Sequence, residues 1–488
     1  EVPSQSPDFR TELAEQIAFL VPEAVADGKI DVAKLRELLN EDVSNDGRER
    51  FGLMWPGKSQ ALRAAQAPTT ATLVPDREAS KDWDTTKNIF VEGDNLEVLK
   101  ILQKHYHGKI KMIYIDPPYN TGKDFIYPDN YKEGLQAYLE WTKQVSEEGK
   151  KLSSNPESSG RYHSNWLNMM YPRLKLARNL LTEDGVVFVS IDDSELENLL
   201  KVCKEIFGEA NHLVTVVWKS KSGGANDSSD VATDHEYIVA FRKASHSSVL
   251  GLDPEAVAST SYNLEDERGR YALERLDKQN LQYSKSLDYS LVGPNGEIYN
   301  LKHRNEAEPN AVWRWSRERV ARDFDQLVFK DGNVYTRNYE KTGGKPRSLF
   351  VDERFGRTRT GSTEVIRLLD GNYFDNPKPS KLLKNLVAIG TGLDSIVLDF
   401  FAGSGTTAHA VMAQNIEDGG TRQFIQVQLP EPVDPASEAG KAGFASIAEI
   451  ARKRIDRAGA QILEEATNQL STRSSALDVG FRSFKLAD

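Results

Sequence analysis

The chain has 488 residues, enough for two or three domains with substantial cores, and it carries a net charge of −11. Its mean hydropathy is −0.54, no run of 18 apolar residues occurs, and the N-terminus has no signal-peptide core, so we expect no membrane span. The one cysteine, Cys203, excludes a disulfide framework and a cysteine-rich zinc site, and the eight histidines are scattered, so we expect no metal centre. Apolar neighbours of Cys203 indicate a buried thiol rather than a nucleophile.

The first 86 residues divide into two stretches of different composition. Residues 8–45 show helical periodicity with acidic residues at the exposed positions, which predicts a small helical segment. Residues 50–86 are rich in alanine, threonine and proline, so we expect an extended arm outside the core.

An alternation of strands and helices begins near Ile89. Apolar runs predict strands at 110–115, 186–191, 213–218 and 237–242. Helical periodicity predicts helices near 132–148, 165–181 and 194–206. Such an alternation is typical of an α/β fold with a mostly parallel sheet.

The strand at 110–115 ends in Asp116-Pro-Pro-Tyr119. Two prolines fix φ and remove backbone donors, so the strand cannot continue and its last carbonyls point outward. Asp116 adds an anionic acceptor and Tyr119 adds a flat ring. Together they suit an aromatic amine, whose N–H groups are accepted while its ring is stacked. The alternative is a tight strand-ending turn with a core tyrosine.

From residue 245 to residue 368 the alternation stops. Aromatic residues and arginines dominate instead, as in Trp313-Arg-Trp-Ser-Arg-Glu-Arg319. An insertion of about 120 residues between two halves of an α/β sheet indicates a separate functional module.

The α/β pattern then resumes. Helices are predicted at 379–389, 405–415 and 444–466, and strands at 395–400 and 424–429. Residues 396–407 read as a buried strand, a Gly-x-Gly turn and a helix start. Gly403 and Gly405 let the backbone bend sharply and approach a ligand. A phosphate-binding turn is the rival reading, but neither the full dinucleotide spacing nor a Gly-Lys-Ser/Thr ending is present.

The two motifs together resemble those of the amino-methyltransferases that use S-adenosylmethionine (SAM) to methylate exocyclic nitrogens of DNA bases. The catalytic motif precedes the SAM motif, as in the circularly permuted β group. The closer resemblance, over nearly the whole chain, is to modification (Mod) subunits of type III restriction–modification systems. The stretches that carry it are 91–99, 116–122, 166–173, 234–236, 376–379 and 399–407.

The resemblance implies a Rossmann-like methyltransferase fold and a role for each motif. Asp116, Pro117, Pro118 and Tyr119 are expected to hold the flipped target base. The residues expected at SAM are Asp94, Asn95, Lys378, Asp399, Phe401, Ala402, Gly403, Ser404, Gly405, Thr406 and Gln428. Among these, Asp94 is expected at the adenine amine of SAM and Lys378 at its carboxylate. Many relatives carry an acidic residue that binds the ribose hydroxyls of SAM. In this chain Gln428 or Glu431 is expected to take that role.

The charge is unevenly distributed along the chain. Residues 1–50 contain 12 acidic and 6 basic residues, whereas residues 301–360 contain 14 basic and 9 acidic ones. Local basic surface is sufficient for phosphate contacts, because counterion release depends on the contacting charges alone. We therefore expect DNA contacts from Arg347, Arg354, Arg357 and Arg359. The alternative is a solvated charged face.

These observations predict a SAM-dependent adenine-N6 methyltransferase that acts on double-stranded DNA. The sequence patterns predict a helical segment and arm at 1–86, and the resemblance implies a catalytic half at 87–244, a target-recognition domain at 245–368 and a SAM-binding half at 369–488. Cytosine-N4 methylation is the nearest alternative, and a non-catalytic specificity subunit is another.

The resemblance to Mod subunits also implies partners. It predicts a homodimer that works with a nuclease/ATPase restriction subunit in the prokaryotic cytoplasm, associated with the nucleoid through DNA. The chain ends at Asp488, where Mod relatives usually continue, so a free-standing methyltransferase is the alternative.

Overall fold

We describe a computed structural model of the chain. It describes residues 17–39 except 19, 27 and 28; residues 53–121; residues 162–468 except 224–230, 245–248, 257–260, 280–281, 306–307 and 341–342; and residues 477–487. The helix predicted near 132–148 lies outside these residues. The chain forms two compact units, Glu1–Gly251 with Pro346–Asp488, and Leu252–Lys345.

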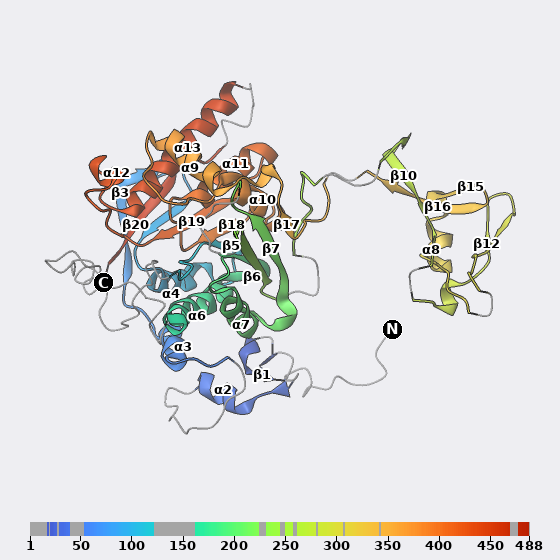
Figure 1. Cartoon of the computed structure of the whole chain (residues 1–488), viewed down its shortest axis with the longest axis horizontal. Helices are drawn as coiled ribbons and strands as arrows, with labels where there is room; N and C mark the ends of the chain where they lie inside the picture. The colour runs from blue at the N-terminus through green and yellow to red at the C-terminus, as the bar shows by residue number, and fades with distance from the viewer. Residues whose placement is uncertain are drawn as a thin grey trace. The chain divides into compact units, whose positions relative to one another are not determined.

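The first unit is built on a ten-stranded sheet (Figure 1). Its strands, in spatial order, are β17 (Leu349–Phe350), β7 (His212–Lys219), β8 (His235–Arg242), β6 (Leu181–Ile191), β5 (Ile110–Ile115), β18 (Ile396–Asp399), β19 (Gln423–Gln428), β4 (Ile89–Glu92), β20 (Phe481–Ala487) and β3 (Thr72–Lys81). Neighbouring strands from β6 through β20 are all parallel. The predicted mostly parallel α/β sheet is confirmed. Because β5 pairs with β18, the two halves of the sequence share one sheet.

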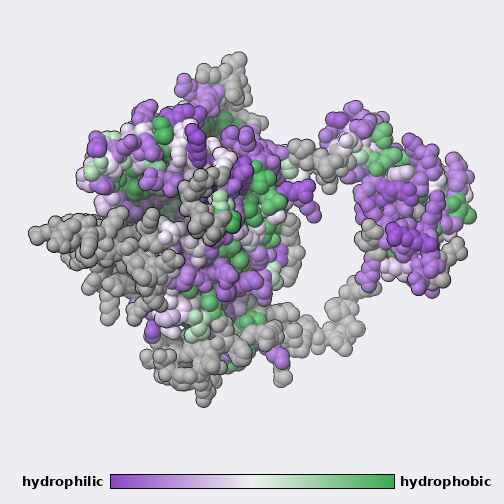
Figure 2. Space-filling model, in the orientation of Figure 1, coloured by the Kyte–Doolittle hydropathy of each residue, from purple (hydrophilic) through white to green (hydrophobic). Residues whose placement is uncertain are grey.

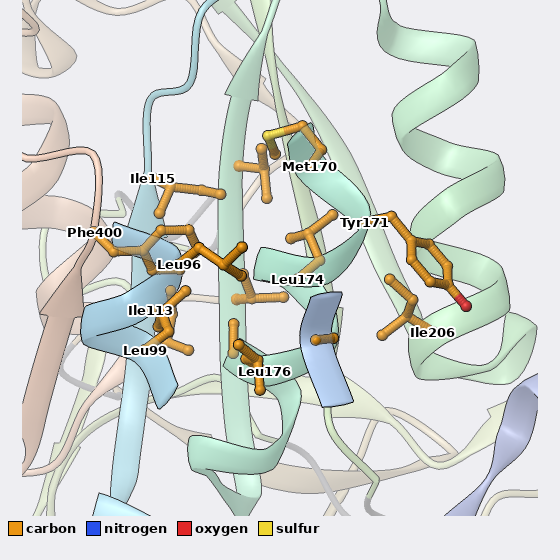
Figure 3. Close-up of a cluster of buried hydrophobic side chains, with 14 of the residues drawn as sticks. Leu96, Leu99, Ile113, Ile115, Met170, Tyr171, Leu174, Leu176, Ile206 and Phe400 are labelled. Atoms are coloured by element: carbon orange, nitrogen blue, oxygen red, sulfur yellow. The ribbon is translucent and has the colours of Figure 1, made fainter. Parts of the chain in front are cut away.

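Helices cover both faces of this sheet. One face carries α3 (Lys58–Gln66), α4 (Asn95–Tyr106), α6 (Tyr162–Leu180) and α7 (Leu196–Phe207). The other carries α9 (Thr358–Leu369), α10 (Ser380–Gly390), α11 (Thr406–Asp418) and α13 (Ile447–Asn468), with the short α12 (Glu438–Lys441). Apolar side chains from strand and helix interlock on the first face, as Ile113 and Leu99 do in Figure 3. Cys203 is fully buried there, as predicted.

The extended arm predicted at 50–86 is wrong. Ala61, Ala64 and Ala65 are buried on α3, because their small side chains let this helix lie close against α6. The ring of Trp55 packs edge-on against Tyr171 at 5.4 Å. Residues 72–81 form β3, which pairs antiparallel with β20. Composition suggested an arm since alanine and threonine form no apolar stripe of their own.

The helical segment predicted at 8–45 is only partly helical within the described residues. Residues Pro22–Ala24 form a short 3-10 turn and Val32–Leu39 form α2. Between them, β1 (Val25–Ala26) and β2 (Lys29–Ile30) pair as a small antiparallel ribbon. A two-residue strand is too short to leave a periodic signal in the sequence.

The second unit has its own small core. Strands β9 (Leu264–Asp266), β10 (Gly269–Arg275), β15 (Leu327–Lys330) and β16 (Asn333–Tyr339) form an antiparallel sheet. The unit also contains helix α8 (Arg317–Arg322) and two antiparallel pairs of short strands. In one pair β11 (Asp277–Lys278) lies beside β14 (Val312–Trp313), and in the other β12 (Leu291–Val292) lies beside β13 (Ile298–Tyr299). The core contains Leu276, Tyr289, Trp313 and Trp315, whereas the visible surface is largely hydrophilic (Figure 2).

The two ends of this unit lie beside each other. Asp253 N donates to Gly344 O at 2.7 Å, and Gly344 N donates to Asp253 O at 3.0 Å. Residues 346–368 belong to the first unit, where β17 pairs with β7 and α9 packs on α13. The compact unit is thus shorter at both ends than the 245–368 predicted for the recognition domain. No helix within the described part of the chain is long and apolar enough to cross a membrane.

Candidate active site

Four parallel strands bring the predicted catalytic and cofactor residues to one edge of the sheet. β5, β18, β19 and β4 are neighbours that run in the same direction. Their carboxyl ends carry Asp116, Asp399, Gln428 and Asp94. This edge is the usual place for ligands in open α/β sheets.

The Asp116-Pro-Pro-Tyr119 turn is held from outside the motif. Trp166 Nε1, on α6, donates to the Pro118 carbonyl at 2.7 Å. Asn120 follows with a positive φ of 64°, and its amide donates to the buried Glu195 carboxylate. Among the described residues none donates to the Pro117 carbonyl. The turn therefore keeps one backbone acceptor for a ligand.

Asp116 and Tyr119 belong to a four-residue charged cluster with Glu236 and Lys378. Lys378 Nζ lies 2.9 Å from both carboxylate oxygens of Asp116, 2.8 Å from the Tyr119 hydroxyl and 3.3 Å from Glu236 Oε2. The Tyr119 hydroxyl lies 3.0 Å from Asp116 Oδ1 and 2.8 Å from Glu236 Oε2. Lys378 is 8% exposed, so it is no surface lysine.

The cluster fixes the protonation of Lys378 and Tyr119 at neutral pH. Burial lowers the pKa of Lys378, but the Asp116 and Glu236 carboxylates outweigh it and the pKa is raised above its ordinary value. Burial, with help from the same two carboxylates, raises the pKa of Tyr119 well above its ordinary range. Lys378 is therefore an ammonium and Tyr119 a neutral phenol. The predicted contact of Lys378 with the SAM carboxylate stays a prediction.

The glycine-rich turn after β18 is held by Asp399. The Asp399 carboxylate accepts from Phe401 N at 3.0 Å and from Thr407 Oγ1 at 2.6 Å. Burial raises the pKa of Asp399 to about 7, against these two hydrogen bonds. Gly403 and Gly405 have φ values of 53° and 80°, which other residues rarely adopt.

Gln428 supports this turn from the next strand. Gly403 N donates to Gln428 Oε1 at 2.7 Å, so the amide oxygen predicted for the ribose already binds the turn. Gln428 Nε2 faces Glu431 Oε1 at 3.4 Å. The residue that contacts the ribose stays a prediction.

Asp94 caps the helix that follows β4, and Asn95 links the start of that helix to the residue before the Phe401–Thr406 glycine-rich turn, where SAM is expected. Asp94 caps α4 by accepting from Leu96 N at 2.9 Å, and its second oxygen lies 3.3 Å from Arg173 Nη2. Asn95 Nδ2 donates to Phe400 O at 2.7 Å. Arg173 is 1% exposed and donates to both Asn95 Oδ1 and Met169 O.

The hydroxyls of Ser404 and Thr406 both accept from Arg454 Nη1 on α13. Arg454 is fully buried, and burial lowers its pKa to about 10, which still leaves it charged at neutral pH. Its Nη2 lies 3.5 Å from Glu364, which also accepts from Ser380 N at 2.9 Å. This network joins the glycine-rich turn to α9 and to the start of α10.

The four predicted DNA-binding arginines fall into two pairs. Arg357 donates to the carbonyls of Val351, Asp352 and Gly356 within its own loop. The guanidinium of Arg354 lies over the Phe355 ring at 4.2 Å. Arg347 and Arg359 are exposed. Arg357 and Arg354 therefore support the loop, while the exposed pair remains suited to phosphate.

Sequence reasoning missed four residues of the site: Glu236, Trp166, Arg173 and Arg454. Glu236 lies in the 234–236 stretch that carried the resemblance, but no role was assigned to it. Trp166 and Arg173 likewise lie within 166–173. Arg454 lies in an ordinary helical pattern, and only the packing of α13 on α11 brings it to the glycine-rich turn.

Comparison with known proteins agrees with this geometry. Residues 110–429 match the family model described as DNA methylase. The type III restriction–modification enzyme StyLTI Mod subunit of Salmonella typhimurium is 36% identical, over 95% of this chain and 70% of the relative. The EcoPI Mod subunit of Escherichia phage P1 is 34% identical (92% and 73%), and the EcoP15I Mod subunit of Escherichia coli is 32% identical (87% and 71%).

The fold and the site thus define a DNA methyltransferase with a permuted order of motifs. Within that class, the chain belongs to the family of type III restriction–modification Mod subunits. Both resemblances predicted from the sequence are confirmed.

Proposed function

We propose that the chain transfers the methyl group of SAM to N6 of an adenine flipped out of double-stranded DNA. The observation that carries the proposal is the juxtaposition of Asp116 and Tyr119 with the glycine-rich turn, on adjacent strands β5 and β18. A base inside a duplex cannot reach such a pocket, so it must be extruded and stacked, here against Tyr119.

The residues at the edge of the sheet fit SAM. Gly403 and Gly405 both have positive φ, so backbone without a side chain is available to approach the ligand. A Cβ on Gly403 would lie 3.2 Å from the Phe374 ring. Asp94 supplies a carboxylate on the neighbouring β4. When bound, SAM supplies a sulfonium methyl that needs no further activation.

The chain itself activates the acceptor. An aromatic amine is a poor nucleophile, because its lone pair is delocalised into the ring. Acceptors at Asp116 and at the Pro117 carbonyl draw the two N–H bonds of the amine toward themselves and localise the lone pair on nitrogen. Positioning and electrostatics then supply most of the rate acceleration.

Adenine is favoured over cytosine by the first residue of the motif. Cytosine-N4 enzymes more often carry serine where this chain has Asp116. The pocket chemistry is otherwise shared, so N4-methylcytosine is the second candidate product.

The names of the relatives support the proposal that this chain is one subunit of a larger enzyme. Each of the three is the Mod subunit of a type III restriction–modification enzyme. We infer that this chain also directs a nuclease/ATPase restriction subunit and acts as a homodimer, in the cytoplasm where it associates with the nucleoid.

Long-read sequencing of DNA from cells that express the chain tests the reaction and maps the recognised motif. We expect N6-methyladenine at one short motif, and none in cells that express Asp116→Ala at the same level. N4-methylcytosine at that motif would establish the second candidate, and unmodified DNA would refute both.

A further inference from the structure

The Lys378 ammonium binds the acceptor that the proposed reaction assigns to the target amine. Its nitrogen donates to both oxygens of Asp116 and to the Tyr119 hydroxyl. An exocyclic amine of the target base needs the same acceptor and the same ring. Both carboxylate oxygens of Asp116 already accept from Lys378 Nζ, so the ammonium and the base amine compete for the same acceptor.

The backbone of Lys378 is packed closely against helix α9. A Cβ on Gly361 would lie 2.0 Å from the Pro377 carbonyl oxygen and 2.9 Å from the Lys378 carbonyl carbon, so α9 packs directly on this segment. The side chain, in contrast, is a flexible four-carbon stem with a compact charge at its end. Lys378 must therefore vacate the amine site by rotation of its side chain.

Glu236 offers the displaced ammonium a second partner. Its carboxylate is 3.3 Å from Lys378 Nζ, and it is fixed on β8, which is paired on both sides. A buried ammonium without a partner is strongly destabilising. Glu236 therefore makes it feasible for Lys378 to leave Asp116.

We propose that Lys378 occupies the amine site while no base is bound, and that Glu236 receives its ammonium when the target base enters. This inference rests on the proposed adenine-N6 reaction. Glu236 and Lys378 are positioning residues, which act on the base through Asp116. For Lys378, this role replaces the contact with the SAM carboxylate.

Competition for Asp116 has a signature that a merely structural role lacks. Purine in place of the target adenine removes the exocyclic amine, and with it one hydrogen bond to the paired thymine. That change in the DNA is the same for every variant of the protein, so differences between variants in the ratio of the two dissociation constants, for adenine and purine duplexes, report on the contact between the amine and Asp116. Duplexes carrying the motif mapped in cells, with S-adenosylhomocysteine present, allow this ratio to be measured by fluorescence anisotropy without turnover.

Removing the second partner should trap the lysine on Asp116. We expect Glu236→Gln to lower the preference for adenine over purine by on the order of tenfold, because the amine must then displace an ammonium that has no charged partner to move to. Lys378→Met should raise this preference above that of the wild type. The double variant should equal Lys378→Met, since the contact of Glu236 with the Tyr119 hydroxyl affects both duplexes alike and cancels in the ratio.

Two further variants serve as controls for this experiment. Lys378→Gln keeps most of the stem without the charge and should also raise the preference, which covers a loss of folding in Lys378→Met. Lys381→Met changes an exposed lysine three residues away and should leave the preference unchanged.

Several results would overturn the proposal. These are additive effects of the two substitutions, equal reductions of the preference in Glu236→Gln and Lys378→Met, or weaker SAM binding by Lys378→Met in calorimetry with an unchanged adenine-to-purine ratio. Failure of the wild-type enzyme to methylate adenine would instead refute the proposed function.

Discussion

Asp116 and Lys378 are 262 residues apart in the sequence, yet their charged atoms are 2.9 Å apart. The sequence indicated the chemical nature of Asp116 and Tyr119, because their effect depends on the turn they share. It could not indicate that Lys378 and Glu236 face them, since that depends on how β8 and the 376–379 segment meet β5. Long-range partners of a short motif are the part of such a site that only the fold reveals.

Asp116 should be needed for the reaction and not for the cofactor. We expect Asp116→Ala to lower single-turnover methyl transfer by at least about a hundredfold, because the variant keeps only the neutral Pro117 carbonyl to polarise the amine. Calorimetric titration should show nearly unchanged SAM affinity. Turnover close to that of the wild type would remove Asp116 from its catalytic role.

Asp399 should make stability depend on pH. Its folded pKa of about 7 lies above the ordinary value of 3.8, so its contribution is fully present below pH 4 and is lost as the pH rises to 7. Three pKa units correspond to about 4 kcal/mol. Asp399→Asn should therefore gain stability relative to the wild type between pH 4 and pH 8. Chemical denaturation at both pH values measures this gain, and a pH-independent difference would contradict it.

At the scale of elements, strands with continuous apolar runs were predictable. β5 has the predicted bounds, and the run at 186–191 forms the end of β6, which begins earlier at Leu181. One of the misjudged elements is α3, whose buried face consists largely of alanines. Its place in the core comes from close packing on α6 rather than from an apolar stripe.

Residues 347–359 contain two arginines that support their own loop and two exposed arginines that we expect to contact phosphate. We expect Arg347→Ala with Arg359→Ala to flatten the salt dependence of DNA binding by about 0.9 in log–log slope for each phosphate that the variant no longer neutralises. Their thermal stability should be unchanged, since both side chains are exposed.

Arg357→Ala is the matched contrast within that loop. It removes three hydrogen bonds to carbonyls and should cost about 1–3 kcal/mol of stability. Thermal denaturation of the three variants checks both expectations. An unstable Arg347/Arg359 variant, or an Arg357 variant of full stability, would reverse the assignment.

At the scale of the whole molecule, specificity is expected to lie in the second unit. Its residues 252–345 include 16 acidic and 15 basic residues, so its net charge is close to zero and any contact with DNA depends on how its basic side chains are arranged. Recognition by this unit would depend on individual side chains at base edges.

Exchange of residues 252–345 for the matching segment of a Mod relative tests this expectation. The hybrid should methylate the relative's motif at the same atom of the base, as read by long-read sequencing. A hybrid that keeps the parental motif would place specificity outside this unit. The join should be made outside Asp253 and Gly344, so that the bridge between them is kept.

The bridge between Asp253 and Gly344 also bears on how such enzymes diversify. Because the chain leaves the methyltransferase unit and returns to it at neighbouring points, the length of the intervening segment does not alter the register of the main sheet. Doubling the length of a closed loop adds only about 0.6 kcal/mol of entropic cost. A lineage can therefore acquire longer, shorter or unrelated segments at this point by recombination, while the methylating machinery is inherited intact.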